Sequence, residues 1–143
     1  MMGSIKDMPK MEACVEVLDS FGIDHEVLVL SAHRTPHKVA KFASAARDNG
    51  FGVIICGAGK AAHLAGAVAA HTTLPVIGVP IAAGALGGVD ALYSTVQMPT
   101  GIPVATVAID SAANAAYLAA SILSVSDETL AARLAQFRVD LTR

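Results

Sequence analysis

Short apolar runs alternate with longer segments of helical periodicity along the whole chain. Runs rich in valine and isoleucine predict β-strands at residues 26–30, 53–56, 75–80 and 104–108. Because these runs are continuously apolar, they favour a parallel sheet that is covered by helices on both faces. The other segments predict helices at 9–21, 35–50, 60–71, from the glycine-rich loop at 84–88 to about Gln97, 111–123 and 127–138.

This alternation predicts a single α/β domain over residues 1–143, with a doubly wound parallel sheet in three layers. Proline and glycine mark the expected boundaries: Pro9 opens the first helix, Gly22 follows its end, and Thr35-Pro36 opens the second. No linker, repeat or low-complexity segment divides the chain. In such sheets a ligand lies beyond the carboxyl ends of the strands, so the residues that follow the apolar runs are the candidates for a site.

The composition is apolar for a soluble protein: 54% of the residues are hydrophobic and 15% are charged, with a net charge of −2. This charge argues against a nucleic-acid partner, and no apolar run is long enough for a membrane span. The first four residues do not resemble a signal peptide. Cys14 and Cys56 lie in apolar settings, which predicts buried, reduced thiols in a cytoplasmic protein.

So much apolar surface with so few charges predicts that part of it is buried between the subunits of a homo-oligomer. The alanine-rich helix at 60–71, with Leu64 and Val68, is the expected source of that surface.

Polar residues follow the apolar run 26–30 directly, in the segment Ser31-Ala32-His33-Arg34. Histidine both gives and takes a proton near neutral pH, and the planar guanidinium of arginine suits phosphate or carboxylate. A second small polar loop, Gly3-Ser4-x-x-Asp7, precedes the first helix, again in a position that suits an anion. Together these segments predict an anionic metabolite bound beside His33.

Two other patterns are weaker. Residues 57–62 match the dinucleotide fingerprint G-x-G-x-x-A, but residues 75–85 contain none of the acidic residues that should follow it. A plain tight turn and a loop whose amides approach a ligand are equal alternatives there. His33 and His37 have a spacing that zinc ligands use on helices, yet Pro36 lies between them and no third ligand accompanies them. No metal site is expected.

Several motifs, in order along nearly the whole chain, resemble the class I N5-carboxyaminoimidazole ribonucleotide mutases of purine biosynthesis. They are GSxxDMPxM, SAHRTP, GAGxAAHL, LPVIGVP, SxVQMPxGxPVATVAI and NAxxLAASIL. The resemblance implies an isomerase that moves a carboxylate from the exocyclic nitrogen of an aminoimidazole ribonucleotide to ring C4 through transient CO2. It also implies a flavodoxin-like subunit, a homo-octamer with active sites at subunit junctions, and chemistry without a metal or an organic cofactor.

Carried over by position, the resemblance makes His33 the general acid and base. His33 would protonate the carbamate nitrogen so that CO2 leaves, and would remove the ring proton after CO2 is recaptured. Ser4, Asp7 and Arg34 match the substrate-binding positions of the family. The residues that match its pocket walls are Ser31, Ala32, Ala58, Gly59, His63 and Leu64.

The chain departs from the family pattern in three places. Lys6 stands where the family has the second serine of GSxSD, and Lys60 where it has the fourth residue of GAGGAAHL. Lys6 is expected either to pair with Asp7 or to point to solvent. The family also has a full apolar strand before GSxSD, whereas this sequence begins at Met1-Met2, so we expect a truncated first strand.

These departures leave two alternatives to the mutase open. One is a non-catalytic or degraded nucleotide-binding paralogue. The other is an aminoimidazole ribonucleotide carboxylase that uses free CO2, which the GAGxAAHL segment disfavours because it resembles the bacterial mutases.

Overall fold

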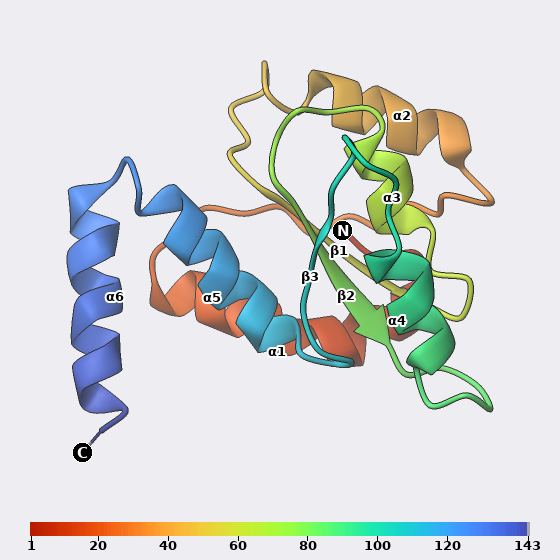
Figure 1. Cartoon of the computed structure of the whole chain (residues 1–143). Helices are drawn as coiled ribbons and strands as arrows, with labels where there is room; N and C mark the ends of the chain where they lie inside the picture. The colour runs from red at the N-terminus through yellow and green to blue at the C-terminus, as the bar shows by residue number, and fades with distance from the viewer. Residues whose placement is uncertain (143) are drawn as a thin grey trace.

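A computed structural model describes residues 1–142 of the chain (Figure 1). A short 3₁₀ turn, η1 (Ile5–Asp7), precedes the first helix. The helices are α1 (Met8–Ser20), α2 (Pro36–Ala45), α3 (Leu64–Ala69), α4 (Val89–Val96), α5 (Ala112–Leu123) and α6 (Glu128–Asp140). The strands are β1 (Ile54–Gly59), β2 (Val76–Ile81) and β3 (Ala105–Thr106).

The sheet is parallel, with strand order β1-β2-β3. Two further extended segments lie beside β1 and form only one-residue bridges. Met2 pairs in parallel with Gly57 of β1 on one side and with Val29 on the other. In chain order the extended segments therefore follow the 2-1-3-4-5 arrangement of a flavodoxin-like sheet. Around Met2, the described part of the first extended segment makes only these two bridges.

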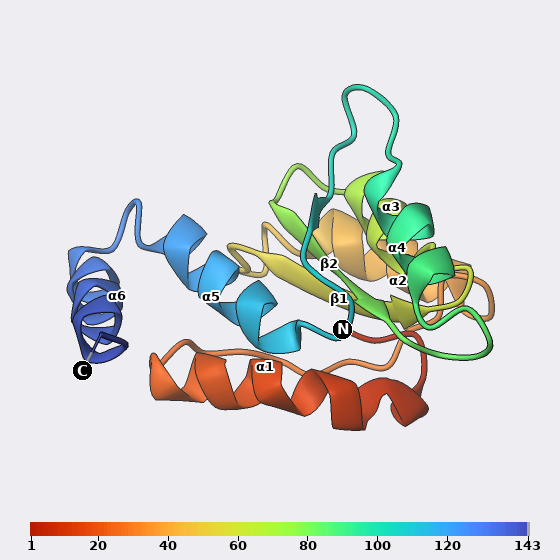
Figure 2. The same cartoon turned by 60° about the horizontal axis from the view of Figure 1, so that its bottom comes forward.

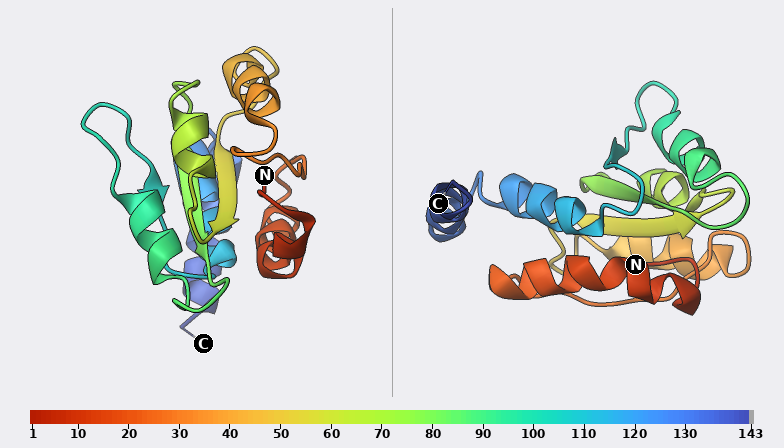
Figure 3. Two further views of the ribbon diagram at one scale, coloured as in Figure 1. Left: turned by 90° about the vertical axis from the view of Figure 1, so that its right-hand side faces the viewer. Right: turned by 90° about the horizontal axis from the view of Figure 1, so that it is seen from below.

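Helices cover both faces of the sheet, which confirms the three-layer, doubly wound prediction. α1 and α5 lie on one face, and α2, α3 and α4 lie on the other (Figure 2, Figure 3). α6 packs on α5 and stands clear of the sheet (Figure 1). Within residues 1–142, none of the helices has the length and apolar character that crossing a bilayer requires.

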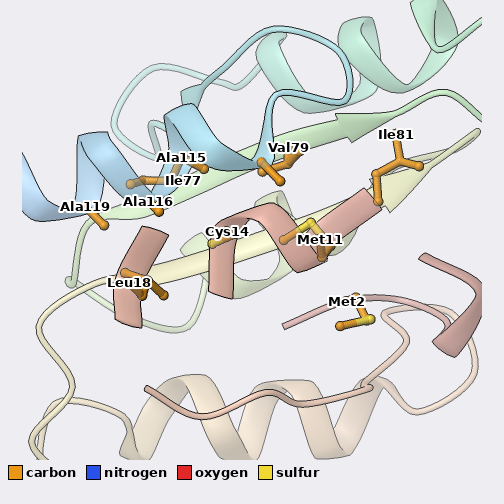
Figure 4. Packing of buried hydrophobic residues seen from close by; sticks show 11 residues of the cluster. Met2, Met11, Cys14, Leu18, Ile77, Val79, Ile81, Ala115, Ala116 and Ala119 are labelled. Carbon is orange, nitrogen blue, oxygen red and sulfur yellow. The ribbon is translucent and has the colours of Figure 1, made fainter. Parts of the chain in front are cut away.

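Each face of the sheet buries its own apolar cluster. On one face Met11 and Leu18 of α1 and Ile77 of β2 pack against alanines of α5, whose small side chains let the helix approach closely (Figure 4). Cys14 lies in this cluster, and Cys56 lies in the cluster on the other face. Both thiols are free, as predicted, and burial raises the pKa of each to about 11.

The structure corrects several of the expected elements. Residues 26–30 do not form a strand: Val29 makes only its bridge to Met2, since a strand needs a partner along its length. The helix expected at 60–71 is shorter, because Lys60 adopts a left-handed φ of 56° that cannot continue a helix. The helix expected at 35–50 ends at Ala45 and is followed by turns.

From the sequence, Leu64 and Val68 were also expected to offer apolar surface to other subunits, and this expectation is wrong. Leu64 is 2% exposed and Val68 is fully buried, because both pack into the core of their own subunit. The apolar face of α3 is therefore already covered. The large exposed apolar side chains belong to other elements, among them Val89, Tyr93 and Val96 of α4.

A mostly apolar cavity of about 250 Å³ lies next to Met1, between residues 23–28 and residues 50–55. The Met1 ammonium group is at its edge, where it donates a hydrogen bond to the Ile55 carbonyl at 2.9 Å. Ile54 N–H donates to the carbonyl of Pro75, just before β2, and Gly57 N–H donates to the Met1 carbonyl. Since donors alternate along a parallel strand, the Ile55 N–H points toward the cavity. The cavity therefore lies between two extended segments whose backbone groups could pair with a further strand.

Asp110 joins α1 to the loop that follows β2. Its carboxylate accepts hydrogen bonds from Lys10 Nζ at 2.6 Å and from the Ala82 amide at 2.9 Å. Burial raises the pKa of this carboxyl, but the Lys10 hydrogen bond, the Ala82 amide and the Lys10 charge together outweigh burial and lower it below its usual value. The ionised form of Asp110 is therefore favoured by folding.

We predict that about four apolar residues joined to the Met1 nitrogen will occupy the cavity as a strand and stabilise the fold. Each side chain that becomes buried should add about 1.5–3 kcal/mol to the free energy of unfolding. By the alternation of donors, amide exchange should slow at Leu28 and Ile55, and hydrogen-exchange NMR with chemical denaturation measures both effects. A glycine–serine extension of equal length is the control. Equal stabilisation by that control, or none by the apolar segment, would contradict the prediction.

A second prediction concerns pH. Since folding lowers the pKa of Asp110, its contribution is present above the unfolded pKa of about 3.9 and is lost as the pH falls through the lower pKa of the folded state. Asp110→Asn should lower the melting temperature at pH 7 and should flatten its dependence on pH below about 4. Thermal unfolding between neutral and acidic pH measures both. An unchanged pH dependence would show that the ion pair with Lys10 does not contribute.

Candidate active site

A cavity of about 640 Å³ lies beyond the carboxyl ends of the segment Met1–Gly3 and of β1. All the residues that the sequence assigned to a substrate site line it: Ser4, Asp7, Ser31, Ala32, His33, Arg34, Ala58, Gly59, His63 and Leu64. These residues meet because neighbouring parallel strands end at the same edge of the sheet, so the loops that follow them lie side by side.

Ser4 and Asp7 cap each other in the turn η1. Ser4 Oγ accepts a hydrogen bond from the Lys6 amide at 3.3 Å, and the Asp7 carboxylate accepts one from the Ser4 amide at 3.1 Å. Burial raises the pKa of Asp7, the Ser4 amide and the Arg34 charge lower it, and the balance lies above the usual value. The Asp7 carboxylate thus gains from a further donor, such as a hydroxyl group of a ligand.

The turn at residues 31–35 holds Arg34 beside this loop. Ser31 N–H donates to Thr35 Oγ1 at 3.0 Å, and Ser31 Oγ accepts a hydrogen bond from the Arg34 amide at 3.2 Å. Arg34 Nη2 in turn donates to the Gly3 carbonyl at 3.0 Å. Because these bonds fix the guanidinium next to Ser4, the two side chains form a natural site for phosphate.

His33 and His63 form a pair across the cavity. His33 Nε2 lies 2.8 Å from His63 Nδ1, and the ring centroids are 4.9 Å apart at an angle of 76°. A hydrogen bond at this contact requires a proton on one of the two facing nitrogens and a lone pair on the other. The tautomers of the two rings are therefore linked, and His63 can set which nitrogen of His33 carries its proton.

The loop between β1 and α3 closes the cavity on another side. A Cβ on Gly59 would lie 2.8 Å from the Cβ of Ala83 and 3.0 Å from the Ile81 carbonyl oxygen, so only glycine fits there without movement. Lys60 follows with its positive φ, and α3 begins only at Leu64. The loop is thus a tight turn whose end is separated from the helix, and it does not open a helix as the dinucleotide fingerprint requires.

Positive charge dominates the lining of the cavity. Lys6, Arg34 and Lys60 all line it, whereas Asp7 is its only acidic residue. Lys6 is exposed, and within residues 1–142 it makes no ion pair with Asp7. Of the two outcomes expected for Lys6, the structure therefore favours the solvent-exposed one. An anionic ligand suits this balance of charge.

Six further residues line the cavity without a role assigned from the sequence: Gly3, Lys6, Lys60, Ala61, Ala83 and Gly84. All six lie in the loops beyond the carboxyl ends of the predicted strands, which is where the sequence placed the candidates for a site. The contact between His33 and His63 was missed, since the two residues are 30 positions apart and nothing local signals their meeting.

Comparison with known proteins identifies relatives over nearly the whole chain. Residues 1–143 match the family described as AIR carboxylase. The chain is 54% identical over 143 residues to the N5-carboxyaminoimidazole ribonucleotide mutase of Vibrio vulnificus, and the match covers 99% of this chain and 89% of that protein. It is 50% identical over 139 residues to the chloroplastic phosphoribosylaminoimidazole carboxylase of Vigna aconitifolia, covering 97% of this chain and 25% of that protein.

The fold also matches a solved structure. The crystal structure of Treponema denticola PurE superimposes with a TM-score of 0.87 at 30% sequence identity, and the match covers 99% of this chain and 88% of that one. The described fold therefore has the overall arrangement of that structure.

Proposed function

This chain belongs to the AIR carboxylase family, and we propose that it acts as an N5-carboxyaminoimidazole ribonucleotide mutase in purine biosynthesis. The observation that carries the proposal is the histidine pair, His33 and His63, in a cavity lined by cations. A carboxylate shift by way of CO2 needs one proton donor that becomes a proton acceptor. Its substrate also carries anionic groups that this lining suits.

The proposed chemistry uses His33 for both proton transfers. Protonated His33 gives its proton to the carbamate nitrogen, the bond from nitrogen to the carboxyl carbon breaks, and CO2 leaves with the amine restored. The ring carbon then attacks CO2 and forms the new carbon–carbon bond. Neutral His33 removes the proton from that carbon, which restores the aromatic ring and returns His33 to its starting state. Because every step moves a proton or CO2, the proposed route uses no metal or organic cofactor.

The neighbouring residues would hold the substrate for these steps. We assign the phosphate to Arg34 and Ser4, and the ribose hydroxyls to Asp7, whose carboxylate is short of donors. His63 would keep the facing nitrogen of His33 in the required protonation state. The residues proposed as walls around the base and the CO2 are Ser31, Ala32, Ala58, Gly59 and Leu64.

A second candidate is a phosphoribosylaminoimidazole carboxylase, the name carried by the relative from Vigna aconitifolia. That reaction uses the same ring carbon but takes up free CO2 instead of receiving it from a carbamate. The two activities would share the site and differ in the first step only. The other alternative, a paralogue without catalysis, keeps the nucleotide site and lacks turnover.

We also propose that the working unit is a homo-oligomer in the cytoplasm, an octamer by the resemblance to the family. His33 and Arg34 are exposed in the isolated subunit, whereas a site that retains CO2 must exclude water. α4 presents an exposed apolar surface that a second copy could cover. Val89, Tyr93 and Val96 recur there at helical spacing and are 44%, 62% and 45% exposed. Contact between copies over α4 would bury this stripe.

We predict that His33→Asn abolishes turnover while the affinity for carboxyaminoimidazole ribonucleotide changes by less than about tenfold, or about 1.4 kcal/mol. Asparagine keeps a polar group of similar size but cannot exchange a proton near neutral pH. Absorbance kinetics measure the rate, and calorimetry measures the binding. His37→Asn is the matched control, since His37 follows on α2 and does not line the cavity. A His33→Asn variant with a near-normal rate would remove His33 from the mechanism.

The two candidate activities can be distinguished by which nucleotide the protein converts and by whether the reaction needs bicarbonate. The mutase should convert the N5-carboxylated nucleotide in a buffer that is free of bicarbonate, at a rate that added bicarbonate does not raise. A carboxylase should instead act on aminoimidazole ribonucleotide only when bicarbonate is supplied. Binding of both nucleotides without conversion of either would identify the paralogue.

For assembly, we predict that the purified chain sediments as an oligomer and that Tyr93→Lys shifts it to smaller species with lower activity. A charge in the centre of the α4 stripe cannot be buried against a second copy without a partner. Val125→Lys is the control, because Val125 is 89% exposed outside α4. Full activity in a species with the mass of one subunit would contradict the proposal, as would equal dissociation by both variants.

A further inference from the structure

We propose that Lys60 is an anion-binding residue that holds the carboxylate group of the substrate, at a subsite separate from that of Arg34 and Ser4. This inference rests on the proposed function, because it concerns a nucleotide that carries a carboxylate as well as a phosphate. It makes Lys60 the residue by which the site distinguishes carboxylated from uncarboxylated aminoimidazole nucleotides.

The first observation is the backbone of Lys60. Its φ is 56°, a left-handed conformation that disfavours every residue with a Cβ and that glycine adopts freely. Apart from Lys60, Asp110 is the only non-glycine residue within residues 1–142 that has a positive φ. The carboxylate of Asp110 accepts two hydrogen bonds, which compensate for its backbone conformation. Strained residues of this kind concentrate where a side chain must serve a ligand.

The second observation is the direction of the Lys60 side chain. Its Cε would lie 3.2 Å from a Cβ built on Gly84, so the aliphatic stem passes over a glycine in the loop after β2. Both residues line the large cavity. The stem of this exposed lysine therefore lies over the Gly84 loop at the rim of the cavity.

The third observation is that the Lys60 charge is uncompensated. The ion pairs of residues 1–142 do not include Lys60, and no hydrogen bond involves its ammonium group. Arg34, in contrast, already donates to the Gly3 carbonyl and lies against Ser31. Within the lining Lys60 is thus a cation that is free to bind a ligand, while Arg34 is a cation fixed beside the phosphate loop.

The general base His33 indicates where the reacting atoms of the substrate would lie. His33 must lie against the imidazole ring and its carboxylate, because it exchanges protons with both reacting atoms in the proposed route. His63, which contacts His33, comes from the same loop as Lys60 and lies three residues after it. Lys60 and the histidine pair thus line the same cavity, and in the proposed route the anionic group nearest to the pair is the carboxylate.

The test compares two nucleotides in four proteins by calorimetry: the original chain, Lys60→Met, Lys60→Arg and Lys6→Met. The nucleotides are carboxyaminoimidazole ribonucleotide and aminoimidazole ribonucleotide, which lacks the carboxylate. Methionine keeps most of the stem and the same backbone strain, so the fold should be preserved, and thermal unfolding checks this. Lys6→Met is the matched control, since it removes a cation from the other loop of the same cavity.

We expect Lys60→Met to weaken binding of the carboxylated nucleotide by about tenfold and to change binding of the other by less than about twofold. Lys60→Arg should retain the discrimination, and Lys6→Met should leave the ratio of the two affinities unchanged. Equal weakening of both nucleotides by Lys60→Met, or no weakening of either, would overturn the inference. If the original chain binds neither nucleotide, the proposed function itself fails, and that result is separate from an unchanged ratio.

Discussion

The pairing of one short segment at the centre of the sheet holds the candidate site together. Met2 is 1% exposed, and its carbonyl accepts a hydrogen bond from Leu30 at 2.9 Å, while the carbonyl before it accepts one from Gly57 at 3.0 Å. These bonds set the ends of two extended segments side by side, and the loops that follow carry His33 and His63. The 2.8 Å contact between the two rings therefore depends on a strand that is little more than one residue long.

The architecture could be predicted from the sequence because the strand-forming runs are strongly apolar and the helices between them are periodic. Three elements were not predicted with their observed type or extent, and for two of them the reason is tertiary. Residues 26–30 have the composition of a strand, but a strand exists only as far as its pairing extends, and here Val29 makes a single bridge, to Met2. The start of α3 is delayed because Gly59 packs against Ala83, and Lys60 must then turn with a positive φ. Neither constraint is local to the residues that it changes.

The candidate site was predicted more completely than the fold around it, since the motifs name its residues directly. Its internal geometry was not predictable. Nothing in the sequence links His33 to His63, and the lysines at 6 and 60 are equally unusual in the motifs but behave differently. Lys6 lies in a turn that Ser4 and Asp7 cap without using its side chain. Lys60 lies against the Gly84 loop, which comes from another part of the chain. The difference between the two is a matter of packing, which a motif does not encode.

The two cysteines give this architecture a practical property. Because burial raises the pKa of each thiol to about 11, the thiolate is scarce at neutral pH, and neither thiol is a good nucleophile while its layer is closed. Cys14 reports on the layer of α1 and α5, and Cys56 on the layer of α2 and α3. The rate at which each thiol reacts with a thiol reagent thus measures how often one side of the sheet opens. The two reaction rates differ if the layers open one at a time, and they are equal if both thiols become exposed only when the whole domain unfolds.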